Sequence, residues 1–268
     1  MKILQLGNGG GFDFDQVSSS FLIKLEKDRY LLFDCGHGIM RRLQELEKED
    51  NATSIIDKIN TVFISHMHDD HIGELSSLIL YRYFIYGLQT TVICTNALLE
   101  DQLEEYLSYT CKTEFNGCQV RNKKMYFVYP YYSEEKEYSD YEFVPLETYH
   151  PGVHSGGLLI LDKTDKLGIA ITGDTKANAN IEETIQKISS KNSDFNFFIF
   201  HDWSLHNEVS RNVHACNDDI EIEYSFYFRK TLIPYHTGES IKDNPISKSF
   251  LGINELSKLY LPYTSCAT

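Results

Sequence analysis

Short apolar runs closed by turn residues dominate the pattern of hydrophobic and polar positions along the chain. Runs of about four to eight residues that are rich in β-branched and aromatic side chains are typical of β-strands. The strands that this pattern predicts are residues 1–7, 19–26, 29–36, 59–66, 90–95, 142–150, 156–162, 166–174, 194–202 and 231–236.

Between these strands, apolar residues recur at the spacing of a helix with one buried face. Asn96 and Asn180 are predicted to cap the starts of two helices, and Gly87 to end another. The helices predicted in this way are residues 37–50, 71–87, 96–109, 180–191 and 216–230.

Strands and helices mix in both halves of the chain, and no low-complexity linker separates the halves. This arrangement predicts a single α+β domain over residues 1–268, with sheets at the centre and helices outside. The strongest discontinuity is the Tyr- and Glu-rich segment 126–141. That segment favours a β-hairpin with a solvated acidic tip, and a substrate lid is the alternative.

Composition narrows the class of protein. The chain has 268 residues and a net charge of −14, which repels polyanions and disfavours extended nucleic-acid binding. A small anionic substrate at a metal centre stays compatible with this charge. The six cysteines form no CxxC pair, no secretory leader begins the chain, and no apolar run approaches the ~20 residues of a membrane span. We therefore expect a cytoplasmic protein that does not enter the membrane.

The segment ISHMHDDHIG, residues 64–73, carries the most distinctive chemistry. His66, His68, Asp70 and His71 follow a predicted buried strand and precede a predicted helix. Imidazole nitrogens and carboxylate oxygens are the ligands of zinc and related first-row metals. The first two histidines share one side if the strand continues, and the other two ligands follow a turn. One segment could therefore serve two adjacent metals.

This motif resembles that of the metallo-β-lactamase superfamily, and four further residues match the superfamily's motifs in order. The match covers about residues 1 to 240, and each of the four residues ends a predicted strand. They are Asp34 in LLFDCG, His150 in FVPLETYH, Asp174 in AITGDT and His236 in TLIPYH. The resemblance implies a four-layer αββα sandwich. It also implies two divalent metal ions, with zinc expected and manganese as the alternative.

The resemblance assigns these residues to two metal sites joined by a bridging aspartate, with Asp34 outside the ligand set orienting a ligand histidine. The first site takes His66, His68 and His150, the second takes Asp70, His71 and His236, and Asp174 bridges them. Alternatives exist for three of these residues. Asp174 could cap a turn, His236 could be a satisfied core histidine, and His154 competes with His150. The strand end favours His150, which leaves His154 to contact substrate.

Two further stretches resemble the ribonuclease Z branch of this superfamily, namely FFIFHDWSLHNE at 197–208 and VHAC at 213–216. By this likeness His214 is the general acid near the leaving group and Asp202 supports it. The branch has a glutamate where this chain has Asp202. Only 24 residues separate His150 from Asp174 (174 − 150), so the basic arm with which tRNA-processing members grip tRNA is missing.

The chain without this arm is similar to the phage-encoded anti-Pycsar proteins, which hydrolyse cyclic nucleotides. The hypothesis is therefore a two-metal phosphodiesterase acting on a small phosphodiester, most simply a cyclic nucleotide. A hydroxide generated between the metals attacks phosphorus, Asp70 belongs to the catalytic set, and His214 protonates the leaving oxygen. The alternatives are a ribonuclease Z-like endonuclease acting on tRNA precursors or other RNA, and a carbon-centred hydrolase acting on a lactone, thioester or lactam. A site that binds metal without turnover, in a sensing or scaffold role, is the further alternative. The resemblance also implies a homodimer, and the Gly run after the first strand predicts a tight turn beside the metals.

Overall fold

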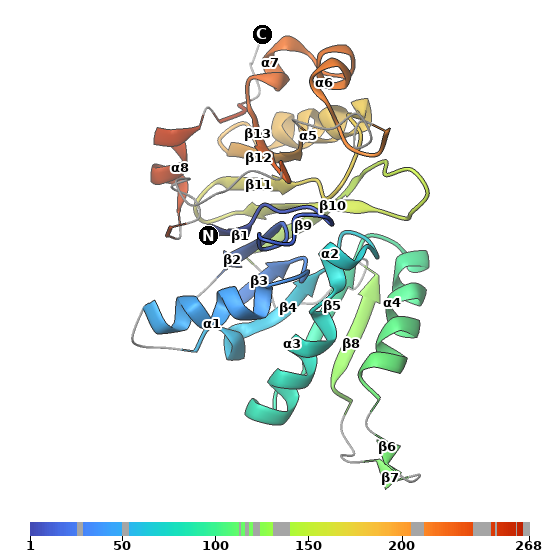
Figure 1. Ribbon diagram of the computed structural model, residues 1–268. Coiled ribbons are helices and arrows are strands. Elements are labelled where there is room, and N and C mark those ends of the chain that lie inside the picture. The colour runs from blue at the N-terminus through green and yellow to red at the C-terminus, as the bar shows by residue number, and fades with distance from the viewer. Residues whose placement is uncertain are drawn as a thin grey trace.

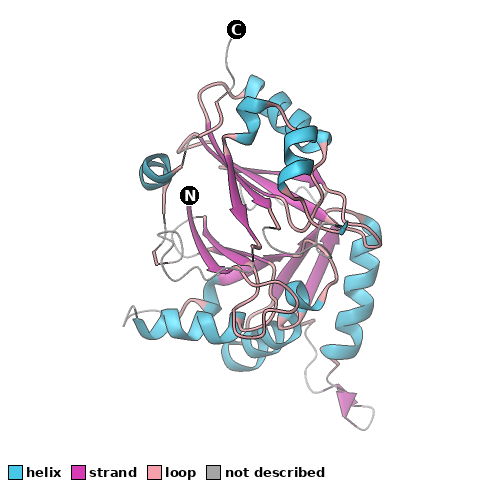
Figure 2. Ribbon diagram, turned by 45° about the horizontal axis from the view of Figure 1, so that its top comes forward, coloured by secondary structure: helices cyan, strands magenta, loops and turns pink. Residues whose placement is uncertain are grey.

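Two β-sheets pack face to face, and helices cover the outer face of each sheet (Figures 1 and 2). This computed structural model describes a set of ranges that excludes several short segments. The described residues are 1–25, 29–49, 54–112, 114–115, 118–119, 124–130, 140–204, 212–237, 248–249, 251–260 and 262–264.

The first sheet has six strands in the order β1-β2-β3-β4-β5-β8. Its first three strands are antiparallel neighbours, and β3 to β8 run parallel. The strands are β1 (Lys2–Gly7), β2 (Ser20–Lys24), β3 (Tyr30–Phe33), β4 (Ile59–Phe63), β5 (Thr90–Cys94) and β8 (Tyr126–Pro130). A two-stranded hairpin, β6 (Glu114–Phe115) and β7 (Cys118–Gln119), precedes β8.

The second sheet has five strands in the order β13-β12-β11-β10-β9. Strands β9, β10 and β11 are antiparallel neighbours, and β11, β12 and β13 run parallel. The strands are β9 (Tyr141–Glu147), β10 (Gly156–Asp162), β11 (Leu167–Ile171), β12 (Asn196–Asp202) and β13 (Leu232–Tyr235).

The helices divide between the two outer faces. On the first sheet lie α1 (Ile39–Glu49), η1 (Ile56–Lys58), α2 (Asp69–Ile72), α3 (Leu75–Tyr81), η2 (Arg82–Tyr86) and α4 (Ala97–Thr110). On the second lie α5 (Ala179–Lys191), α6 (Asn217–Glu223) and α7 (Phe226–Arg229). Helix α8 (Ile253–Leu259) contributes Leu256 to the core between the sheets. No helix in the described ranges is both long and apolar enough to cross a membrane.

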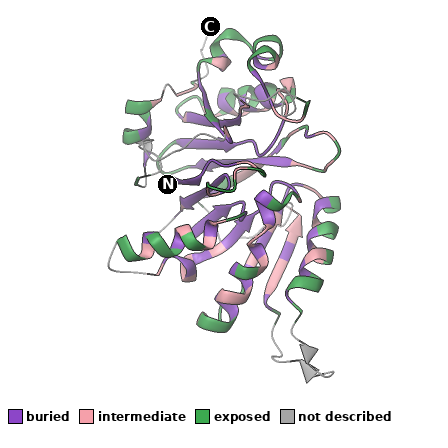
Figure 3. Cartoon of the chain, in the orientation of Figure 1, coloured by how far each residue is buried: buried purple, intermediate pink, exposed green. Residues whose placement is uncertain are grey.

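Three apolar cores among the described residues separate the four layers. Figure 3 shows that most strand residues are buried and that the exposed residues lie mainly on the helices. The central core joins the facing surfaces of the two sheets, where the rings of Phe21 and Phe200 lie 4.9 Å apart. Each outer core joins one sheet to its helices. Strand β10 is buried along its whole length, which explains why GGLLILD reads as a continuous apolar run without alternation. The predicted αββα sandwich is therefore confirmed.

Tertiary contacts overrule the sequence pattern in four places. The helix predicted for 71–87 is divided, because the Glu74 amide donates to the Cys35 carbonyl at 2.9 Å and leaves the helical path after Ile72. Its end at Gly87 is confirmed, with φ at 71°. The helix predicted for 216–230 is divided at Tyr224, which is extended before α7 begins.

The other two differences concern a cap and a loop. Asn178 caps α5 in place of the predicted Asn180, because its side chain accepts a hydrogen bond from the Asn180 amide at 3.0 Å. The hairpin predicted for 126–141 is wrong. Strand β8 belongs to the first sheet and β9 to the second, so the segment crosses between sheets. Its predicted acidic tip, residues 131–139, lies outside the described residues.

Candidate metal centre

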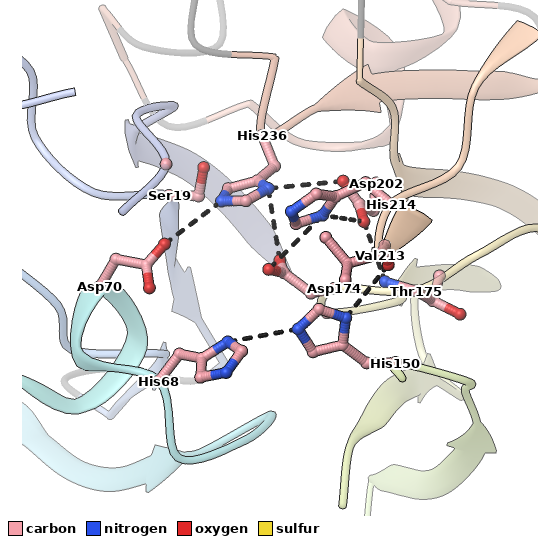
Figure 4. Close-up of polar contacts among 12 residues, drawn as sticks. Ser19, His68, Asp70, His150, Asp174, Thr175, Asp202, Val213, His214 and His236 are labelled. Atoms are coloured by element: carbon pink, nitrogen blue, oxygen red, sulfur yellow. Dashed lines mark hydrogen bonds and ion pairs between the residues drawn. The ribbon is translucent and has the colours of Figure 1, made fainter. Parts of the chain in front are cut away.

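The predicted ligands converge at one edge of the sandwich, where several parallel strands end (Figure 4). His66, His68, Asp70 and His71 follow β4 and continue into α2. The others follow strands of the second sheet: His150 follows β9, Asp174 follows β11 and His236 follows β13. The carboxyl ends of parallel strands share one edge of a sheet, so residues far apart in the sequence meet there.

Three histidines form the first cluster. The Nε2 atom of His66 lies 2.9 Å from Nδ1 of His68, and Nε2 of His150 lies 3.2 Å from the same His68 atom. His66 and His150 are buried, whereas His68 is exposed. The cluster therefore opens to solvent on the His68 side.

Asp70, His71 and His236 form the second cluster. The Oδ2 atom of Asp70 lies 3.5 Å from Nε2 of His71 and 3.5 Å from Nε2 of His236. All three side chains are buried. The two clusters are the two ligand sets that the sequence resemblance implies.

Asp174 lies between the clusters and presents one carboxylate oxygen to each. Its Oδ2 atom is 3.8 Å from Nε2 of His66, and its Oδ1 atom is 3.3 Å from Nε2 of His71. Its side chain is only 2% exposed. This is the position that a bridging ligand needs.

The donor atoms fit a pair of divalent cations. Zinc–nitrogen bonds of about 2.0–2.1 Å in a tetrahedral site set neighbouring donors about 3.3 Å apart, close to the spacing in both clusters. Among the described residues, His71 Nε2, Asp174 Oδ1 and His236 Nε2 are buried without a hydrogen-bond partner. Buried carboxylates and imidazoles without partners are costly. Two cations would satisfy these atoms and offset the negative charges of Asp70 and Asp174, which are both buried.

Asp34 holds the second cluster from outside. The Nδ1–H of His71 donates to Oδ2 of Asp34 at 2.7 Å, which leaves Nε2 free to face the cluster. The Ser65 amide and hydroxyl donate to the same carboxylate at 2.7 and 2.8 Å. Asp34 and His236 both have positive φ, 60° and 59°, so their backbones hold a strained conformation at this site.

His214 lies beside Asp174 and is bound to Asp202. Its Nδ1–H donates to Oδ2 of Asp202 at 2.8 Å, and the Thr175 amide donates to the same oxygen at 2.9 Å. Burial lowers the pKa of His214, but the charge and hydrogen bond of Asp202 outweigh burial and raise that pKa above 6.5. The Nε2 side of the ring is left to carry a proton toward a ligand.

Comparison with known proteins identifies the family of this chain. The family profile of Anti-Pycsar protein Apyc1 matches residues 1–260. The chain belongs to this family. An Anti-Pycsar protein Apyc1 of Bacillus phage 010DV004 is 30% identical over 108 residues, which are 40% of this chain and 40% of the relative. The matched stretch thus spans less than half of that relative's length.

Solved structures agree with the sandwich. The metallo-beta-lactamase fold protein YhfI from Bacillus subtilis is similar with a TM-score of 0.62 and 16% identity, over 91% of this chain and 89% of that one. The short form of human tRNase Z is similar with a TM-score of 0.62 and 16% identity, over 90% of this chain and 94% of that one. At this identity the likeness concerns the fold, which is the metallo-β-lactamase fold.

His154 lies in the loop between β9 and β10 and is exposed. With Asn96 and Tyr149 it lines a cavity of about 310 Å³ that also borders His150. The Nδ1–H of His150 donates to the Val213 carbonyl at 3.1 Å, so its Nε2 atom faces the first cluster. In this family member the cavity therefore adjoins the first cluster.

Sequence reasoning missed two supports of the site. Asn8 accepts a hydrogen bond from the His236 amide at 2.7 Å and so holds that residue in its strained conformation. The Val213 carbonyl orients His150. An asparagine in a glycine-rich turn and a main-chain carbonyl carry no signal of such a role in a single sequence. The Gly turn itself lies beside the second cluster, as expected, since a Cβ added at Gly10 would lie 3.4 Å from His236.

Proposed function

We propose that the chain is a two-metal phosphodiesterase that hydrolyses a small phosphodiester, with a cyclic nucleotide as substrate. The observation that carries the proposal is the pair of donor clusters joined by Asp174, with the Asp202–His214 pair next to it. Two divalent ions, zinc first and manganese as the alternative, would activate water and neutralise charge on the phosphate.

The residues of the chain divide the remaining tasks. His66, His68 and His150 would hold one ion, Asp70, His71 and His236 would hold the other, and Asp174 would be a ligand to both. Asp34 keeps the proton of His71 on Nδ1, which maintains the lone pair of Nε2 toward the site. Asp70 faces both His71 and His236, and substitution of Asp70 therefore removes a ligand and disturbs the charge balance of the second cluster.

His214 is the general acid in this proposal. Because its Nδ1–H is engaged by Asp202, its Nε2–H is the proton available to the departing oxygen. The raised pKa of His214 favours retention of this proton as pH rises. The leaving oxygen takes this proton and departs from phosphorus as a hydroxyl group. The cyclic phosphodiester thereby opens to a phosphate monoester.

A small substrate is favoured over RNA for two reasons. The described residues between His150 and Asp174 form only the β10–β11 hairpin and its flanking loops, with no arm to grip a tRNA. The net charge of −14 repels a polyanion at long range. The cavity beside His150 offers room for part of a nucleotide, with His154 as a contact.

The test is a comparison of substrates and variants. Metal-loaded protein is expected to hydrolyse a cyclic mononucleotide faster than a tRNA precursor or a simple ester. His68→Ala and Asp174→Ala are expected to lose about a hundredfold or more of this activity, because each removes a metal ligand. Asp194→Ala, which changes an exposed residue outside the clusters, is the matched control.

Three other results would contradict the proposal or assign a different function. Undiminished turnover in both cluster variants would contradict the metal site. Preferential cleavage of the tRNA precursor would assign the chain to ribonuclease Z-like chemistry, and preferential ester turnover to carbon-centred hydrolysis.

A further inference from the structure

The loop between β1 and β2 exposes two phenylalanines. Phe12 and Phe14 are each 90% exposed, more than any other large hydrophobic side chain in the described part of the chain. Single exposed apolar residues are common on protein surfaces, but two phenyl rings in three residues form an apolar patch that calls for a partner.

The backbone of this loop lies on the second metal cluster. A Cβ added at Gly10 would lie 3.4 Å from Nε2 of His236, and one added at Gly11 would lie 3.5 Å from the carboxylate of Asp70. Phe12 follows Gly11 directly. The backbone that leads into Phe12 and Phe14 is therefore anchored at the rim of the site.

Hydrogen bonds fix the shape of the loop. The Asp13 carboxylate accepts from the Gly10 amide at 2.8 Å, and the Asp13 amide donates to the Gly10 carbonyl at 3.1 Å. The Gln16 amide donates to the Asp13 carbonyl at 2.9 Å, and the Gly9 amide donates to the Val17 carbonyl at 3.0 Å. Asp13 thus turns inward to the loop, which leaves the side chains on either side of it directed to solvent.

We propose that Phe12 and Phe14 form an aromatic platform that stacks on the base of the nucleotide whose phosphate lies at the metal centre. This inference rests on the proposed function and identifies the residues that favour a substrate carrying a base over one without a base. Rings beside a metal centre can hold a base without making hydrogen bonds to it. Asp13 and Asp15 alternate with the two phenylalanines and give this loop negative charge, which repels an anionic nucleotide. Stacking on the rings is therefore the attraction that this loop offers.

The test compares two substrates that differ only in the base. One is a 3′,5′-cyclic mononucleotide, and the other is the 3′,5′-cyclic phosphate of 1-O-methyl ribofuranose. The double variant Phe12→Ala/Phe14→Ala is expected to raise KM for the nucleotide about tenfold or more, with kcat changed less than about twofold. Its KM for the base-free substrate is expected to stay unchanged.

Two further variants test whether stacking on the rings causes the change in KM. Phe12→Trp/Phe14→Trp restores KM for the nucleotide to near the original value if stacking is the cause. Ile222→Ala, which removes another exposed apolar side chain on α6, leaves both substrates unaffected.

The outcomes separate this inference from the proposed function. If the original protein hydrolyses both substrates and the double alanine variant changes neither, or changes both equally, the platform is wrong and the phosphodiesterase stands. If the original protein hydrolyses neither, the proposed function fails and the platform fails with it. Loss of a dimer in the double variant, measured by light scattering at assay concentration, would assign the rings to contact between two copies and overturn the platform.

Discussion

Two cluster histidines and the neighbouring His214 each have one ring nitrogen held by a partner that fixes the ring. His71 is held by Asp34, His150 by the Val213 carbonyl, and His214 by Asp202. The partner decides which nitrogen carries the proton, and so which nitrogen can bind a metal or deliver a proton. Motif order was enough to predict the acids Asp34 and Asp202, but not a main-chain carbonyl.

The Asp202–His214 pair gives a prediction about pH. The general acid must be protonated, so kcat is expected to fall as pH rises through the pKa of His214. Asp202 raises this pKa, and Asp202→Asn removes the negative charge that does so. The alkaline limb of the kcat profile is therefore expected to move to lower pH, with a loss of about tenfold at pH about 8.

This prediction is checked by measuring kcat across the neutral and alkaline range, with Asp194→Asn as the control. A reduced rate with an unmoved alkaline limb would show that Asp202 acts only through structure and that His214 is not the acid.

At the scale of elements, the site depends on the close approach of α2 to the turn after β3. The Cys35 amide donates to the His71 carbonyl at 2.7 Å, and the Glu74 amide donates back to the Cys35 carbonyl. Gly36 lies in this contact, because a Cβ there would stand 1.7 Å from the Asp70 carbonyl oxygen. Helix α2 therefore presents Asp70 and His71 only while position 36 has no side chain.

Gly36→Ala is expected to push α2 away from the turn. Overpacking against main chain is expected to lower the free energy of unfolding by about 3 kcal/mol or more, and to weaken binding at the second metal cluster. Gly87→Ala is the control, since Gly87 has a positive φ but no atom within 4 Å of an added Cβ, and it is expected to cost about 1 kcal/mol. Urea denaturation and metal content check both. Equal stability of the two variants would contradict the close-contact account of α2.

The same contact shows why element boundaries were harder to predict than element types. The apolar spacing in 71–87 is helical throughout, and Gly73 alone was too weak a local sign of the break that Glu74 and Cys35 impose. The segment 126–141 looked like a hairpin because two strand-like runs flank a polar stretch. Only the pairing of β8 with β5, and of β9 with β10, shows that the runs belong to different sheets.

At the scale of the whole molecule, the two halves of the sandwich each supply part of the metal centre. The first half contributes the HMHDDH segment, and the second contributes His150, Asp174 and His236. The central core packs the two sheets against each other. Donor atoms from opposite halves of the chain are thereby close enough to bind the same metal ion. The sequence predicted this convergence through the order of motifs at strand ends. It could not predict the aromatic loop, because exposure of Phe12 and Phe14 is a property of the folded turn.

The most direct test is anomalous diffraction at the zinc edge from crystals of the zinc-loaded protein. We expect two peaks, about 3.5–4 Å apart, with Asp174 between them. One peak should contact His66, His68 and His150, and the other Asp70, His71 and His236. An absence of peaks at this edge of the sandwich, or zinc bound only elsewhere, would contradict the two-metal centre.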